Sequence, residues 1–190
     1  VTIEVSDGEY ISTTTFILTI YPVNDAPVIA SIADQAIDED TSLTLQLTAN
    51  DIDGDDLTYF AQVDDNGSAS VDGSTLTVTL DADYNGDILV LVTVSDGQAE
   101  DSDSFTLTVN AVNDAPVIAS IADQAIDEDS YLTLELSASD IDGDVLTFSA
   151  SNGNADISVD GTTLTVTPEE NYFGSSIITV GVSDSNLSDF

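Results

Sequence analysis

The chain has 190 residues, of which 37 are aspartate or glutamate and none is lysine, arginine, histidine or cysteine, so its formal net charge is -37. Without basic side chains it is not expected to bind nucleic acid, whose phosphates are held by Lys and Arg, or anionic membrane surfaces. The absence of cysteine excludes disulfides, and no apolar run is long enough to predict insertion into a membrane as a helix.

The chain begins with residues 1–22, which read as two strands and include "ISTTTFILTI" at 11–20. The preceding "VSDG" at 5–8 returns at 94–97, where it lies inside the next part of the chain. We therefore expect residues 1–22 to be the C-terminal strands of a preceding repeat, and the chain to be an interior piece of a longer protein.

A long internal repeat organises the rest of the chain. "VNDAPVIASIADQAIDED" at 23–40 recurs unchanged at 112–129, which gives a period of 112 - 23 = 89 residues. After one residue is lost near position 66 the spacing becomes 88, so that Asp96 corresponds to Asp184. The sequence predicts a complete repeat over 23–111 and a second repeat over 112–190 that stops before its last strand.

Within the complete repeat, apolar residues alternate with polar ones, which is the period of a half-buried strand. Seven short runs have strand character: "VIASI", "LTLQLTA", "LTYFAQV", "SASV", "STLTVTL", "ILVLVTV" and "SFTLTV". "ILVLVTV" at 88–94 starts apolar on both faces, as expected of a central strand. Asp-Gly and Asn-Gly pairs mark turns between the runs. The pattern predicts an all-β fold of seven-stranded Greek-key β-sandwiches joined end to end.

The loop at 51–56, "DIDGDD", concentrates carboxylates in a chain that has no counter-charge. It supplies Asp51, Asp53 and Asp55, and the second copy supplies Asp140, Asp142 and Asp144. Two carboxylates ~5 Å apart repel by roughly 0.8 kcal/mol in water and about 3 kcal/mol at an effective dielectric constant of 20. Calcium takes six to eight oxygen ligands, so the loop predicts a calcium site. Asp56 is Val145 in the second copy and is not expected to be a ligand.

The order of these motifs resembles a cadherin-type repeat, in the bacterial form found in tandem in large surface and biofilm adhesins. "VNDAP" resembles the cadherin linker, "AIDEDTSLTLQL" the strand with a calcium-binding glutamate, and "NDIDGDDLTY" the Asp-x-Asp loop. "LDADYNGDILVLVTVSDG" resembles the segment that completes the site. The resemblance covers the whole chain and implies cadherin- or immunoglobulin-like sandwiches with two or three calcium ions at each junction between repeats.

The resemblance also implies the ligands. At the first junction they are Asn24, Asp25, Asp51, Asp53, Asp55 and Asp96. At the second they are Glu39, Asp81, Asp83, Asn113, Asp114, Asp140, Asp142, Asp144 and Asp184. In the last repeat "PEENYFG" stands where the first has "DADYNG", so Glu169 or Glu170 is the substitute ligand there.

We therefore expect a calcium-rigidified structural repeat of an extracellular adhesin or filament, which acts as a rod-like extender in cell adhesion or a biofilm matrix. Its partners would be neighbouring repeats of the same or identical chains, and the sequence does not identify an adhesive target. One alternative is a carbohydrate-binding surface module, although the chain has no Trp to form a sugar platform. Another is the subunit of a non-covalent polymer in which 11–20 completes another copy's open sandwich. An enzyme is not expected.

Overall fold

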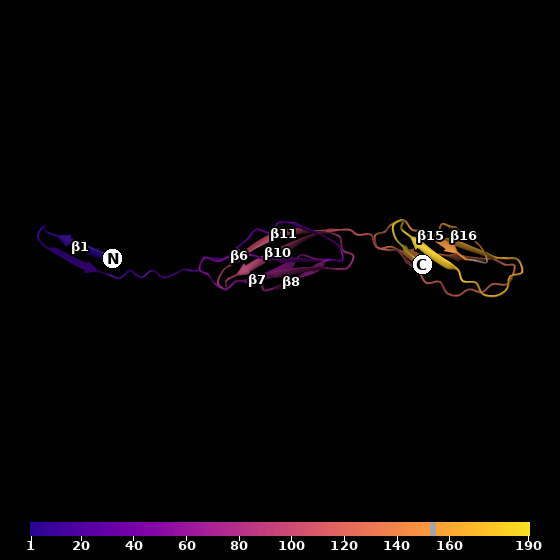
Figure 1. The fold of residues 1–190 in the computed structure, drawn as a ribbon, viewed down its shortest axis with the longest axis horizontal. Helices are drawn as coiled ribbons and strands as arrows, with labels where there is room; N and C mark the ends of the chain where they lie inside the picture. The colour runs from indigo at the N-terminus through magenta and orange to yellow at the C-terminus, as the bar shows by residue number, and fades with distance from the viewer. Residues whose placement is uncertain (153–154) are drawn as a thin grey trace. The chain divides into compact units, whose positions relative to one another are not determined.

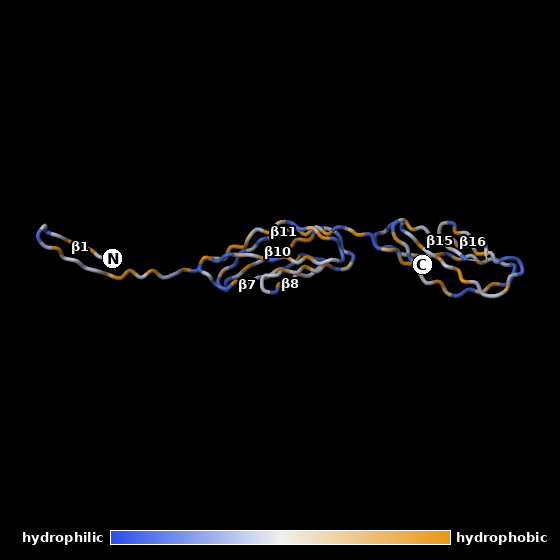
Figure 2. The backbone as a smooth tube through the Cα atoms, viewed as in Figure 1, coloured by the Kyte–Doolittle hydropathy of each residue, from blue (hydrophilic) through white to orange (hydrophobic). Residues whose placement is uncertain are grey.

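The computed structural model describes residues 1–152 and 155–190, and its regular elements over these residues are all strands (Figure 1). Within the described residues no helix is long and apolar enough to cross a membrane. Figure 2 shows hydrophobic and hydrophilic residues alternating along the chain. Unit 1 comprises Val1–Ile37, Thr41–Asp81 and Asp87–Thr108, and unit 2 comprises Asp38–Asp40, Ala82–Gly86 and Val109–Phe190.

Unit 1 begins with an antiparallel hairpin of β1 (Thr2–Ser6) and β2 (Ile11–Thr15). Its turn is closed by Asp7, whose Oδ1 accepts hydrogen bonds from the backbone N–H groups of Tyr10 (2.7 Å) and Glu9 (2.9 Å). These bonds lower the pKa of the Asp7 carboxyl group. Every residue of both strands is exposed.

The first sandwich follows the hairpin. Its strands are β3 (Val28–Ile29), β4 (Gln35–Asp38), β5 (Ser42–Gln46), β6 (Ala49–Asn50), β7 (Thr58–Val63), β8 (Gly67–Asp72), β9 (Thr75–Leu80), β10 (Gly86–Ser95) and β11 (Glu100–Asn110). They form sheets ordered β5-β9-β8 and β4-β11-β10-β7, with β3 paired to β6. The predicted all-β fold is confirmed.

The strands differ from the sequence prediction in three places. The run 43–49 is split, because β5 pairs with β9 whereas β6 pairs with β3. β4 was not among the seven predicted strand runs, and the resemblance assigned 36–47 to a single strand, whereas β4 and β5 are separate. β10 lies inside its sheet, as expected. Only one of its faces is buried, however, because Leu89 on the other face is half exposed.

Alternating residues of both sheets form the core of the first sandwich. Leu43 on β5 and Leu76 on β9 are buried in one sheet. In the other sheet the buried residues are Ile88, Val90, Val92, Val94, Phe105, Leu107 and Val109. Burial of each such side chain stabilises the fold by about 1.5–3 kcal/mol, so the apolar interior, and not ion pairing, holds this acidic chain folded.

The second sandwich, in unit 2, repeats part of this plan. Its strands are β12 (Val117–Ile118), β13 (Leu132–Glu135), β14 (Ala138–Ser139), β15 (Thr147–Ser151), β16 (Ala155–Asp160), β17 (Thr163–Pro168), β18 (Thr179–Ser183) and β19 (Ser188–Asp189). The sheets are ordered β13-β17-β16 and β15-β18-β19, with β12 paired to β14. Leu136, Leu164 and Val166 form its buried core.

The two sandwiches differ where the sequence does not. Residues 35–38 and 124–127 are both Gln-Ala-Ile-Asp, yet the first set forms β4 beside β11 and the second forms no strand. The counterpart of β11 is the two-residue β19, which lies beside β18. A strand needs a partner to satisfy its backbone groups, so β4 depends on β11 rather than on its own sequence.

The two units do not coincide with the predicted repeats. Asp38–Asp40 and Ala82–Gly86 belong to the repeat predicted over 23–111, but they are part of unit 2. The predicted boundaries at 22, 111 and 190 therefore stay a prediction. As a result, acidic residues of the repeat 23–111, within Asp38–Asp40 and Ala82–Gly86, lie in the same compact unit as the acidic residues of the next repeat.

Candidate metal centres

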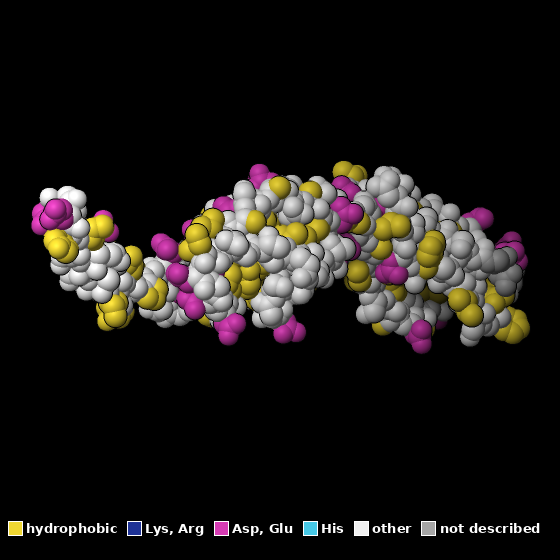
Figure 3. All heavy atoms as spheres, turned by 60° about the vertical axis from the view of Figure 1, so that its left-hand side comes forward, with side chains coloured by type: hydrophobic (Ala, Val, Ile, Leu, Met, Phe, Trp, Pro, Cys, Tyr) yellow, Lys and Arg dark blue, Asp and Glu magenta, His cyan; other side chains and the backbone are white. Residues whose placement is uncertain are grey.

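The surface of the protein is acidic. In Figure 3, magenta aspartate and glutamate side chains are spread over the visible face, and the sequence contains no lysine, arginine or histidine to lie among them. Three groups of carboxylates, described below, bring oxygen atoms within 4.8 Å of one another among the described residues.

The first group is in the loop between β6 and β7. Asp51 organises this loop, since its Oδ1 accepts hydrogen bonds from the N–H groups of Asp53 (2.8 Å), Gly54 (2.9 Å) and Asp55 (3.3 Å). Gly54 has φ +80°, a backbone conformation that glycine adopts without strain. The carboxylates of Asp51, Asp53 and Asp55 converge. The Oδ2 atom of Asp51 is buried and has no hydrogen-bond partner.

The second copy of the loop has the same organisation. Asp140 Oδ1 accepts the N–H of Asp144 (3.2 Å), and Gly143 again has positive φ. The Oδ2 atom of Asp140 is also buried without a partner. A buried carboxylate oxygen that accepts no hydrogen bond is costly, and the same atom is left in this state in both copies.

The linker is tied to each loop. The Asp25 N–H donates to Asp53 Oδ2 (2.7 Å), and the Asp114 N–H donates to Asp142 Oδ2 (2.8 Å). These bonds hold the linker backbone against the Asp-x-Asp loop. The backbone of Asp25 and of Asp114 therefore lies next to the loop carboxylates.

Each linker asparagine binds an aspartate that directly follows a strand, Asp96 after β10 and Asp184 after β18. Asn24 Nδ2 donates to Asp96 Oδ2 (2.9 Å), and Asn113 Nδ2 donates to Asp184 Oδ2 (2.7 Å). The pKa of Asp96 is lowered first by the Ala99 N–H and then by the Asn24 amide. The pKa of Asp184 is lowered in the same way by the Leu187 N–H and the Asn113 amide.

The other two groups lie together in unit 2 and share Asp114. One group is Glu39, Asp114 and Asp142, and the other is Asp40, Asp83 and Asp114. Glu39 is only 3% exposed. Its Oε1 accepts the N–H of Val112, and its Oε2 accepts the side-chain amide of Asn85 (3.3 Å). These two hydrogen bonds hold the Glu39 carboxylate between Asn85 and the linker residue Val112.

The carboxyl group of Asp114 has a raised pKa. Burial is the largest cause of its raised pKa, followed by repulsion from Asp83, Asp142, Asp40 and Glu39. Its counterpart Asp25 belongs to none of the three groups.

Seven of the fifteen predicted ligands are therefore brought together in these groups. The three carboxylate groups contain Asp51, Asp53, Asp55, Glu39, Asp83, Asp114 and Asp142. Predicted residues that lie outside them are Asn24, Asp25, Asp81, Asp96, Asn113, Asp140, Asp144 and Asp184. The role of all fifteen residues as calcium ligands stays a prediction.

Asp40 was missed by the sequence prediction. Its Oδ1 accepts the N–H of Asp83 (3.2 Å), and both residues have positive φ (58° and 56°). Asp and Asn tolerate this region better than other non-glycine residues. The acidic run "DED" at 38–40 was the available signal, but only Glu39 of that run was assigned as a ligand from the resemblance.

The chemistry of these groups fits calcium. All their donors are carboxylate oxygens, and hard cations prefer oxygen, whereas zinc sites are built from Cys, His and carboxylate. The unpartnered oxygens of Asp51 and Asp140 are acceptors that a cation would satisfy. Bound calcium would supply positive charge to carboxylates that otherwise repel one another.

Comparisons with known proteins give a family. The family model described as "Bacterial Ig domain" matches residues 24–110 and 113–189. Among curated protein sequences nothing matches the chain.

Solved structures with the same fold include Drosophila N-cadherin EC1-4 (17% identity, TM-score 0.54, covering 87% of this chain and 48% of that one). Human protocadherin-24 EC1-2 is similar (16% identity, TM-score 0.50, covering 84% and 87%). A glycoside hydrolase family 107 endo-fucoidan hydrolase also matches, but its TM-score is 0.40, at 21% identity. The chain spans about a third of that hydrolase, or 32% of its length. The cadherin likeness agrees with the predicted fold.

Proposed function

The chain belongs to the bacterial Ig domain family, and we propose that it is a calcium-rigidified structural repeat of an extracellular adhesin or filament. It acts as a rod-like extender in cell adhesion or a biofilm matrix at a bacterial surface. Its partners are neighbouring repeats of the same or identical chains. It has no catalytic role of its own.

One observation carries the calcium proposal. The Oδ2 atoms of Asp51 and Asp140, at corresponding positions of the two repeats, are both buried without a hydrogen-bond partner. Each lies in a loop whose other carboxylate oxygen accepts backbone N–H groups. Backbone N–H groups thus bind Oδ1 of each aspartate, and Oδ2 is left available, which is the arrangement that a cation ligand needs.

The residues that would hold calcium follow from the geometry. In unit 2 they are Glu39, Asp40, Asp83, Asp114, Asp140 and Asp142. Three of these residues come from the repeat predicted over 23–111, Asp114 comes from the linker, and Asp140 and Asp142 come from the loop of the next repeat. Calcium bound there would tie the three segments together. Without it, repulsion among these six carboxylates would loosen the same segments.

The proposal also covers the domain organisation. Residues 1–22 are the C-terminal strands of one repeat, 23–111 are a complete repeat, and 112–190 are most of the next. Repeats that contact only their neighbours make a quasi-one-dimensional object. Calcium bound at the linker then limits bending between one repeat and the next.

Titration of the chelated protein with calcium tests the proposal. We expect the melting temperature to rise by several degrees, and small-angle X-ray scattering to report a stiffer and longer particle, as calcium is added. Potassium chloride at matched ionic strength is the control, because screening alone relieves part of the repulsion in a chain of charge -37. If scattering and melting are the same in calcium and in the salt control, the calcium role is wrong.

A further inference from the structure

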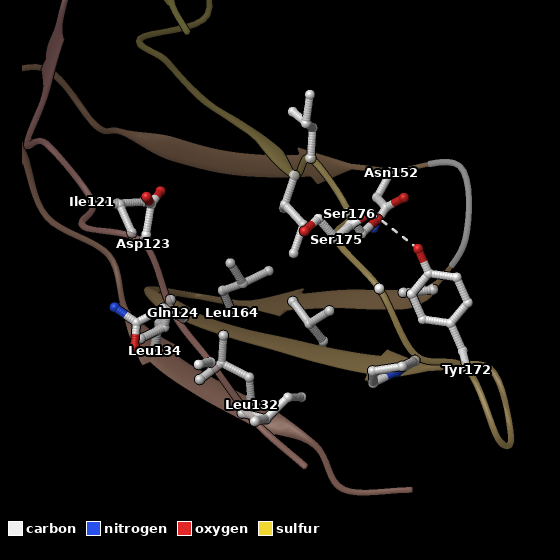
Figure 4. A pocket seen from close by; sticks show the side chains of 18 of the residues that line it. Ile121, Asp123, Gln124, Leu132, Leu134, Asn152, Leu164, Tyr172, Ser175 and Ser176 are labelled. Carbon is white, nitrogen blue, oxygen red and sulfur yellow. Dashed lines mark hydrogen bonds between the residues drawn. The ribbon is translucent and has the colours of Figure 1, made fainter. Parts of the chain in front are cut away.

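A cavity of about 760 Å³ in unit 2 lies inside its sandwich. Figure 4 shows Leu132 and Leu164 on its wall, and at one end the Tyr172 hydroxyl group donates to the Ser175 carbonyl oxygen (3.0 Å). Leu164 corresponds to Leu76, which is buried in the core of the first sandwich. The cavity is therefore core space, and the surfaces on which a partner can bind are the outer faces of the sheets.

One outer face of the first sandwich carries apolar side chains that its core does not use. This face is the solvent side of β7, β10 and β11. Phe60 on β7 is 55% exposed and Leu89 on β10 is 52% exposed, and Leu91 is half-buried. Phe60 lies opposite Thr93 and Leu91 lies opposite Gln62, so Phe60 and Leu91 are diagonal neighbours, whose long side chains can reach one another. The three residues form the apolar centre of the face.

The rest of this face is uncharged. The hydroxyl groups of Thr93 and Ser102 are hydrogen-bonded across β10 and β11 (2.9 Å). Along these three strands, all of whose residues are described, the acidic side chains on this side are at the two ends: Asp87, which accepts the Thr108 hydroxyl group (2.8 Å), and Glu100. Between them the polar residues are Thr58, Gln62, Thr93, Ser95, Ser102, Ser104 and Thr106. We call these seven residues, with Phe60, Leu89 and Leu91, the Phe60 face.

The fold does not require the apolar residues of the Phe60 face. The second sandwich pairs β15 with β18 in the register of β7 and β10, and it has Ser149 in place of Phe60 and Thr179 in place of Leu91. Leu89 alone stays apolar there. The inward residues Tyr59, Ala61, Val92 and Val94 correspond to Phe148, Ala150, Val180 and Val182. A sandwich of this kind therefore forms with the same inward pattern and a more polar outer face, and Phe60 and Leu91 are available for an interaction.

Charge indicates which partner fits. The net charge of the chain is -37, so most surfaces of two copies repel one another at close range. Two Phe60 faces meet without a carboxylate between them. Their apolar centres would leave water together, and their hydroxyl and amide groups would form a polar rim, which is the usual anatomy of a protein interface.

We propose that the Phe60 face binds the same face of a second copy of this chain, so that two chains associate side by side. The contact is isologous, since both copies contribute the same residues. The two sheets pack face to face about 10 Å apart, with Phe60, Leu89 and Leu91 of both copies between them. This contact goes beyond the proposed function, which concerns the joints within one chain.

The size of the face sets the strength of the contact. Three strands and the residues from Leu89 to Ser95 cover roughly 10 Å by 20 Å. Stable interfaces bury about 800 Å² on each partner, so one pair of Phe60 faces gives a weak contact. Weak contacts add when several are made at once, as between chains held at high density on one surface. The assays must therefore detect a weak, concentration-dependent dimer.

Cross-linking of single-cysteine variants is the first test, because the chain has no cysteine of its own. Thr93→Cys places a thiol on the Phe60 face. Thr77→Cys is the matched control, since Thr77 is also a half-buried threonine, on the outer side of β9 in the other sheet. We expect a short bis-maleimide reagent to link the Thr93→Cys chains into dimers faster than the Thr77→Cys chains, at a rate that rises with protein concentration. Equal rates for the two variants would overturn the inference.

The second test removes the apolar centre with residues that the second sandwich already uses. Phe60→Ser combined with Leu91→Thr should fold, which circular dichroism and the melting temperature check. In the Thr93→Cys background this double change should slow cross-linking by about tenfold or more, as the loss of central anchor residues commonly does. In sedimentation equilibrium the wild-type mass should rise with concentration, whereas the double variant should stay monomeric.

Both tests are made in EDTA with potassium chloride, which screens repulsion between the acidic surfaces. Dimers that form there support the inference even if calcium has no effect on stiffness. A wild-type chain that stays monomeric at every concentration, or a folded double variant that cross-links as fast as its parent, overturns it, whatever calcium does. Binding of a soluble polysaccharide to the monomeric chain that is lost in the double variant would assign the face to a sugar and would also overturn it.

Discussion

Asp51→Asn gives the sharpest test of the metal centre, because it should act in opposite directions with and without calcium. Without calcium, the asparagine keeps Oδ1, which can still accept the N–H groups of Asp53, Gly54 and Asp55. Its amide takes the place of the unpartnered Oδ2, within reach of two carboxylates. Repulsion falls, so the calcium-free variant should melt higher than the wild type.

With calcium, the same change removes a ligand. Loss of groups that only support a metal ligand lowers affinity by about 10–100-fold, and we take about 100-fold for a direct ligand. An ion present at about 100 times its dissociation constant stabilises a protein by about 2.7 kcal/mol, and a hundredfold weaker ion by about 0.4 kcal/mol. The expected loss is about 2.3 kcal/mol, or about 5–9 °C in melting temperature.

The assay is differential scanning calorimetry of the wild type and variant in EDTA and in calcium. Asp56→Asn is the matched control, since it makes the same charge change in the same loop at a residue outside the three carboxylate groups. Its effect should be the same in both buffers. A variant at position 51 that is destabilised equally in EDTA and in calcium would refute the reasoning, because Asp51 would then only brace the loop.

Other expectations follow from the same geometry. Asp114→Asn should reduce the number of bound calcium ions measured by calorimetric titration, whereas Asp25→Asn should change it less, since only Asp114 belongs to two carboxylate groups. The pKa of Asp184 is lowered chiefly by the Leu187 N–H. Its stabilisation is therefore complete above the ordinary carboxyl pKa of about 3.9 and is lost as pH falls below it, and Asp184→Asn should flatten the acid limb of stability measured in EDTA. Leu76→Ala, at a residue with no exposed surface, should cost about 2–5 kcal/mol in urea unfolding, independently of calcium.

Much of the fold was predictable because its signals are local and repeated. The alternation of Leu76 and Val78 with threonine predicts a strand with one buried face, and both are fully buried on β9. The repeat of "VNDAP" predicts tandem domains, which the family match confirms. Short runs were harder. β4 has only four residues, and its identical copy at 124–127 forms no strand, so no local rule could have separated them.

The candidate site was predictable where ligands are adjacent in sequence. Asp51, Asp53 and Asp55 form a group from one loop, as their spacing indicates. Asp40 joins its group only because Asp83, far along the chain, donates a hydrogen bond to it. In the second loop, Asp142 is drawn into a group with Glu39 and Asp114. These contacts depend on packing between distant segments, which spacing alone does not encode.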